Sequence, residues 1–206
     1  MKTTVSRLYD SYDDAARAVN GLVDAGIPQE DIGIVASNVE GRTVPTVVET
    51  TDAGGGAGTG AGIGGLLGGG AGLLAGLGML AIPGLGPVVA AGWLASTAAG
   101  AVAGVAAGAV TGGIIGALTN AGVSEVHANV YAEGVRRGGA LVTARVDDER
   151  LPAANAILDR HGPVDPEARG RAYREGGWSR FDEGADPYTA EQVARERRFY
   201  ERGPMI

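Results

Sequence analysis

The sequence predicts an α+β protein in which a small ferredoxin-like α/β sandwich is interrupted by an apolar helical hairpin and followed by a polar tail with a short helix. Three observations predict this organisation. Strand and helix patterns fill residues 1–52 and return in residues 125–162. Between them, residues 53–124 contain no charged side chain. Residues 163–206 are again rich in charge, so the chain divides into these four segments.

The first segment has the pattern of a strand, a helix and a second strand. Residues 3–9 form the first strand, and Ser11 can cap the following helix with its hydroxyl oxygen. Gly26 and Pro28 mark the end of that helix. Residues 32–36 then alternate as a strand does. The apolar face of the helix carries Ala15, Val19, Leu22 and Val23.

Small residues recur at every fourth position of the central segment, in two registers separated by a Pro- and Gly-rich break at residues 82–87. This pattern predicts two glycine-striped helices, at about residues 57–80 and 88–118, packed as an antiparallel hairpin. The predicted helix-packing positions are Gly56, Gly60, Gly64, Gly68, Gly72, Gly76, Gly92, Ser96, Gly100, Gly104, Gly108, Gly112 and Gly116.

The central hairpin is long enough to cross a membrane. A helix over residues 57–80 is roughly 36 Å long, against a hydrocarbon core of ~30 Å. Each interior glycine costs ~1 kcal/mol relative to alanine in water, whereas small residues let helices approach closely in lipid. We therefore expect a transmembrane hairpin in the inner membrane, in contact with lipid and with both termini in the cytoplasm. The alternative is a cytoplasmic glycine-zipper hairpin buried in an oligomer or against the α/β domain.

The third segment repeats the α/β pattern. Ser124 can cap a helix that ends near Arg136 and Arg137, and residues 140–146 alternate as a strand. Asp147 or Asp148 is expected to cap a last helix, whose apolar residues are Leu151, Ala154, Ile157 and Leu158. The two arginines suit a helix end, and they are also candidates for contact with lipid or a partner.

The tail contains one predicted helix and two large aromatic side chains in a polar context. Thr189 and Gln192 have the spacing of a capping box. Trp178 and Phe181 indicate docking, either onto the folded domain or onto a partner. The alternative is a mostly solvated tail.

Three stretches resemble a known family, the bacterial general stress proteins of the YflT type. They are residues 5–11 (VSRLYDS), residues 25–28 (AGIP) and residues 131–142 (YAEGVRRGGALV). The resemblance covers about residues 1–38 and 125–162 and leaves out the central segment and the tail. It implies a small α/β domain associated with stress responses, and it implies no catalytic residues.

No motif for a cofactor or a metal stands out. Residues 60–65 spell G-x-G-x-x-G, but no acidic residue follows about 20 positions later to bind a ribose. His127 and His161 are 34 positions apart in a chain without cysteine, so they do not suggest a zinc site. The net charge of −7 argues against nucleic-acid binding.

We therefore expect a non-enzymatic, stress-associated membrane protein without a cofactor. It would self-assemble into a homo-oligomer through its glycine-striped helices and present its α/β domain and tail to other proteins. The alternative is a soluble oligomeric stress-response module that binds a small ligand.

Overall fold

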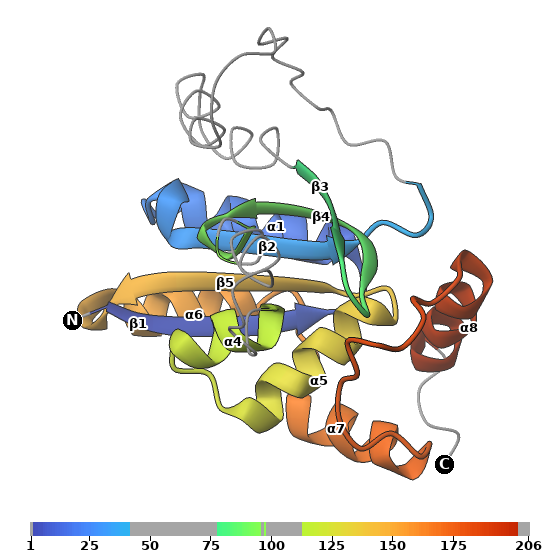
Figure 1. Cartoon of the computed structure of the whole chain (residues 1–206). Helices are drawn as coiled ribbons and strands as arrows, with labels where there is room; N and C mark the ends of the chain where they lie inside the picture. Colours follow the sequence, from blue (N-terminus) through green and yellow to red (C-terminus); the bar gives the residue numbers. More distant parts are fainter. Residues whose placement is uncertain (1, 42–77, 96, 98–112, 202–206) are drawn as a thin grey trace, which may run out of the picture.

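The protein is built around one five-stranded antiparallel sheet with strand order β1-β5-β2-β4-β3 (Figure 1). The computed structural model describes residues 2–41, 78–95, 97 and 113–201. The strands are β1 Lys2–Tyr9, β2 Ile32–Ser37, β3 Gly78–Ile82, β4 Gly86–Gly92 and β5 Ala140–Asp147. The α-helices are α1 Tyr12–Asp24, α4 Ile114–Asn120, α5 Glu125–Arg136, α6 Leu151–Asp159, α7 Pro166–Glu175 and α8 Ala190–Glu201, with short 3₁₀ turns at Gln29–Asp31 and Asp148–Arg150.

Strand β5, from the second half of the chain, lies between β1 and β2 in the sheet. It pairs antiparallel with β1, where Tyr9 lies opposite Ala140, and antiparallel with β2, where Ala36 lies opposite Ala140. Strands β1 and β2 are therefore parallel, and both end where β5 begins. Helix α8 lies beside this end of the sheet (Figure 1).

Helices cover both faces of the sheet. Helices α1 and α6 pack on one face, with Leu22 and Leu158 fully buried there. Helices α4 and α5 pack on the other face, with Leu118 and Val135 fully buried. The predicted mixed α+β class is confirmed, but the arrangement has three layers and differs from a two-layer ferredoxin-like sandwich. Strand β5 explains the difference, because nearly all its side chains are buried and both its faces need a cover.

Two strands occupy positions where the sequence predicted helices. Residues 78–82 and 86–92 form the hairpin β3–β4, so the predicted helices over 57–80 and 88–118 are wrong there. The Pro-Gly break is a tight turn in which the Leu85 amide donates to the Ile82 carbonyl at 3.0 Å. Gly84, at φ 73°, supplies the left-handed residue that follows Pro83 in such a turn. Strand β4 is covered on both faces, so it reads as an unbroken apolar run.

The structure describes only two of the predicted helix-packing positions. Gly92 ends strand β4, and Gly116 is buried in the short helix α4. The others lie outside the described residues: Gly56, Gly60, Gly64, Gly68, Gly72, Gly76, Ser96, Gly100, Gly104, Gly108 and Gly112. Within residues 2–41, 78–95 and 113–201, no helix has the length and apolar composition needed to cross a membrane. The predicted transmembrane hairpin is therefore unsupported.

Local signals in the sequence place most helix ends correctly. The hydroxyl oxygens of Ser11 and Ser124 accept the predicted capping bonds, and Thr189 and Gln192 form the capping box. The expected cap of α6 is wrong, because a 3₁₀ turn at Asp148–Arg150 separates the two aspartates from the helix.

Tyr9 ties β1 to α6. It is fully buried, and its hydroxyl donates to the Leu158 carbonyl at 2.9 Å. We expect Tyr9→Phe to lower the free energy of unfolding by about 1–2 kcal/mol at neutral pH, because a buried acceptor loses its donor.

Burial raises the pKa of Tyr9 above its ordinary value of about 10. The wild type should therefore lose stability as the pH rises above about 10, and Tyr9→Phe should lose less there. Urea titrations at pH 7 and pH 10.5 measure both effects; equal pH dependence in the two proteins would contradict the assignment.

Candidate functional site

The tail begins with a helix that the sequence analysis did not predict. Helix α7 is capped by Asp165, whose carboxylate accepts from the amides of Glu167 and Ala168 at 2.8 and 3.0 Å. These bonds lower the pKa of Asp165 below its ordinary value. Pro166 occupies the first turn, where its missing N–H costs nothing. The Asp-Pro-Glu sequence was the available signal for this helix.

The two aromatic side chains singled out in the tail make different contacts. Phe181 is buried in the apolar cluster of α4 and α5, and its amide donates to the Asn129 side chain at 3.1 Å. Trp178 is half-buried and meets Tyr173 edge-on, with ring centroids 5.5 Å apart. The predicted docking onto the folded domain is thus what the structure shows for Phe181, and docking onto a partner stays a prediction.

A buried carboxylate lies at the centre of the contact between α5 and the tail. Glu133 is 1% exposed and accepts from Arg137 Nε at 2.7 Å and from Arg136 Nη1 at 3.4 Å. A carboxylate buried this deeply needs such partners, because desolvation alone is very costly. The two arginines that end α5 are therefore fixed by their own helix before they reach the tail.

The side chains of both arginines also contact the tail. Arg137 Nη1 bonds to both carboxylate oxygens of Glu196 at 3.3 Å, and its guanidinium lies 4.2 Å from the ring centroid of Tyr173. Burial alone would lower the pKa of Arg137, but Glu133 and Glu196 outweigh burial and hold its pKa above the ordinary value. Arg136 Nη2 donates to the Asp186 carbonyl at 2.9 Å.

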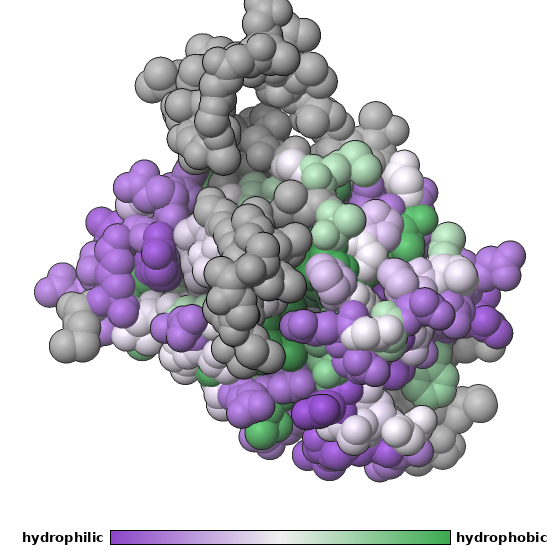
Figure 2. All heavy atoms as spheres, in the orientation of Figure 1, coloured by the Kyte–Doolittle hydropathy of each residue, from purple (hydrophilic) through white to green (hydrophobic). Residues whose placement is uncertain are grey.

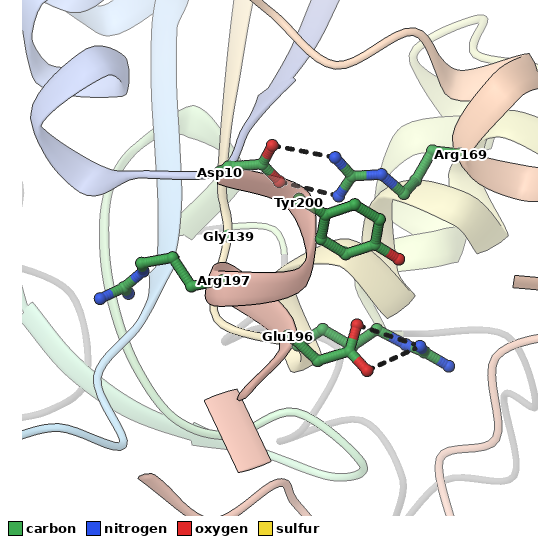
Figure 3. A pocket seen from close by; sticks show the side chains of 8 residues that line it. Asp10, Gly139, Arg169, Glu196, Arg197 and Tyr200 are labelled. Atoms are coloured by element: carbon green, nitrogen blue, oxygen red, sulfur yellow. Dashed lines mark hydrogen bonds and ion pairs between the residues drawn. The ribbon is translucent and has the colours of Figure 1, made fainter. Parts of the chain in front are cut away.

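A second ion pair connects α7 and α8 to the end of β1. Arg169 donates from two nitrogens to both oxygens of Asp10, at 2.7 and 2.9 Å (Figure 3). Its guanidinium lies 3.6 Å from the ring centroid of Tyr200 on α8. Arg197 points away from this pair (Figure 3). It meets Glu40, just after β2, at 3.3 Å. Helix α8 is thus connected to the ends of both parallel strands.

Close approach of α8 requires a residue without a side chain. A Cβ atom on Gly138, which has φ 105°, would lie 2.2 Å from Val193 Cγ1. Val193 is 1% exposed and is the only buried side chain in the described part of α8. We call the surface that receives α8 the docking site, formed by Asp10, Glu40, Arg137, Gly138 and Arg169.

The energy that holds α8 is modest. Full burial of one valine contributes roughly 1.5–3 kcal/mol, and partly exposed ion pairs contribute about 1 kcal/mol or less each. Phe199 of α8 remains 64% exposed. Figure 2 shows hydrophilic side chains over much of the visible outer surface of the described part. Helix α8 is therefore held mainly by polar contacts and is among the elements expected to open locally.

The remaining space at the docking site is very small. The cavity has room for only about one water molecule. It is lined by Asp10, Gly134, Arg137, Gly139, Arg169, Glu196, Arg197 and Tyr200. The closed site therefore holds a helix and leaves no space for a metabolite.

Three of the four predicted contact residues lie at the contact between the tail and the domain, and the fourth packs within the tail. Arg136 and Arg137 pair with Glu133, Phe181 is buried, and Trp178 packs on Tyr173. Their contact with lipid or with another protein stays a prediction. The residues that the sequence analysis missed are Asp10, Glu40 and Arg169, which look like ordinary surface charges until the fold brings them together. In the described ranges, no three His, Asp or Glu side chains are grouped as metal ligands.

Comparison with known proteins identifies the first part of the chain. Residues 4–84 match the family model described as the heat induced stress protein YflT domain. The match confirms the family that the sequence resembles, but it extends into the central segment and does not include residues 125–162. Searches of curated proteins and of solved structures found no match. Residues 4–84 thus match the domain of the YflT-type general stress proteins, and the rest of the chain lies outside this match.

Proposed function

We propose that the chain is a non-enzymatic module of the stress response that works through protein contacts at the docking site. The family match supports the link to stress. The observation that carries the rest is a site at the end of the sheet that is already filled by a helix of the same chain, held by Arg169, Arg137 and Arg197. Polar pairs of this kind allow a helix to be exchanged without exposing a large core.

A second candidate function is binding of a small anionic ligand. It has in its favour that Arg137, Arg169 and Arg197 line one cavity. However, each arginine already pairs with a carboxylate, and a ligand would have to displace α8. A clear rise in Tm with added phosphate, absent for sodium chloride at equal ionic strength, would favour this candidate over the first.

Self-assembly through the glycine series belongs to residues that the structure does not describe, apart from Gly92 and Gly116. Helix packing by these residues, and contact with lipid, stay predictions. The proposal made here depends on neither.

The ion pair between Arg169 and Asp10 gives the proposal its test. We expect Arg169→Ala to increase hydrogen exchange in α8 about tenfold, because Tyr200 of α8 loses the guanidinium on which it stacks. The bidentate pair that fixes this guanidinium to Asp10 is lost with it. Cells that lack the protein should then differ in survival after heat shock when they receive the variant instead of the wild type.

Arg171→Ala is the matched control, since Arg171 is an exposed arginine on the same helix. It should leave both hydrogen exchange and heat survival unchanged. Equal heat survival with the wild type and Arg169→Ala, despite a loosened α8, would contradict a role for the docking site.

A further inference from the structure

Helix α8 presents its contacts on one face with a regular spacing. Val193, Glu196, Arg197 and Tyr200 stand at positions i, i+3, i+4 and i+7. This is the spacing by which a helix is recognised in a groove. Each of these side chains meets its own part of the docking site: Gly138 receives Val193, Arg137 pairs with Glu196, Glu40 pairs with Arg197, and Arg169 stacks on Tyr200.

The connection to α8 is long enough to let the helix leave. Phe181 is fixed in the apolar cluster of α4 and α5, and residues 182–189 lead from it to the capping box of α8. Fully extended, these eight residues span up to about 26 Å. The backbone of this connection packs on Gly84, and Arg136 holds the Asp186 carbonyl. The side chain of Pro187 also packs on Gly86, and the Tyr188 ring lies 5.1 and 5.5 Å from the guanidinium carbons of Arg136 and Arg137. In an exchanged pair, the contacts that break within one chain are remade with the other copy.

We infer that the docking site also accepts α8 from a second copy of this chain, so that two copies dimerise by exchanging their C-terminal helices. The second copy is the occupant that the structure supports, because its α8 carries the four contact residues and the matching charges. Exchange replaces each contact within a chain by the same contact between chains. A short linker keeps the chain's own α8 at an effective concentration on the order of millimolar, so exchange requires high concentration or a weakened internal contact.

Reversing the charge of one residue of the Arg197–Glu40 pair distinguishes a helix α8 bound within its own chain from one exchanged between two copies. In Arg197→Glu and in Glu40→Arg, like charges face each other within each chain. In a 1:1 mixture of these full-length variants, both exchanged contacts join opposite charges. We expect about tenfold more dimer in the mixture than in either variant alone, measured by light scattering after gel filtration. The double variant Glu40→Arg/Arg197→Glu restores the internal pair and should behave as the wild type.

A concentration series provides the second measurement. The wild type should be monomeric at about 10 µM and increasingly dimeric towards millimolar concentration. Val193→Asp removes the apolar contact with Gly138 and should stay monomeric throughout. A dimer that persists in Val193→Asp would mean that another surface joins the copies, and it would overturn the inference. So would a mixture with no more dimer than the separate variants.

The inference rests on the docking site of the proposed function, but its failure can be distinguished from failure of that function. Dimer formation is measured on purified protein, and heat survival is measured in cells. Altered heat survival with Arg169→Ala and no exchanged dimer would leave the proposed function in place and exclude a second copy as the occupant.

Discussion

Gly92→Ala is expected to lower the free energy of unfolding by about 2–5 kcal/mol. A Cβ atom at this position would lie 1.8 Å from the carbonyl oxygen of Ile32 and 3.1 Å from the Cα of Gly33. Both atoms belong to the backbone of β2, which cannot move without breaking its pairing with β4 and β5. The left-handed φ of 75° adds strain for any residue with a side chain. Denaturant titration followed by circular dichroism measures the loss.

Gly122→Ala is the matched control for Gly92→Ala. Gly122 has a φ of 93°, and a Cβ atom there would have no neighbour within 4 Å. This variant carries only the conformational strain, about 1–2 kcal/mol. Equal stabilities of the two variants would contradict the close contact between β4 and β2 at Gly92.

In the central segment, the sequence pattern does not distinguish a helix from a strand. A continuous apolar run fits a helix in lipid and a strand buried on both faces equally well. Val88 and Val89 favour the strand by their branched side chains, but the regular glycine spacing favours a helix. The decision depends on β2, which offers β4 a partner edge. The other edge of β2 pairs with β5 from the second half of the chain, so the place of β4 depends on the whole sheet and no local pattern reveals it.

At the docking site, too, local patterns in the sequence predicted some elements, whereas contacts between distant residues could not be predicted. Local signals identified α8, through the Thr189 and Gln192 capping box, and the arginines that end α5. They did not identify the partners, because Asp10 and Arg169 are 159 positions apart. Pairing over such a distance depends on the whole fold. The Arg-Arg-Gly-Gly sequence at 136–139 combines two requirements: cations at the helix end, and glycine where α8 approaches.

The network around Glu133 is expected to be the most sensitive polar feature of the docking site. Glu133→Ala should lower the free energy of unfolding by about 3–5 kcal/mol, because it removes the buried carboxylate that pairs with two largely buried arginines. The side chains of Arg136 and Arg137 are 14% and 17% exposed, so water can replace little of the lost pairing. Arg137 retains Glu196 as a partner, which places the expected loss towards the lower end of that range. Thermal and denaturant unfolding measure it.

Glu125→Ala is the control on the same helix, since Glu125 is an exposed acid in the first turn of α5. It should cost about 1 kcal/mol or less, the usual value for an acid at a helix N-terminus. Glu133→Gln keeps the size of the side chain and one acceptor, so it should lie between the two. Hydrogen exchange should also rise in α8 for Glu133→Ala, because Arg137 connects this carboxylate to Glu196. An unchanged α8 in a clearly destabilised variant would show that Glu133 supports α5 alone and does not hold the tail.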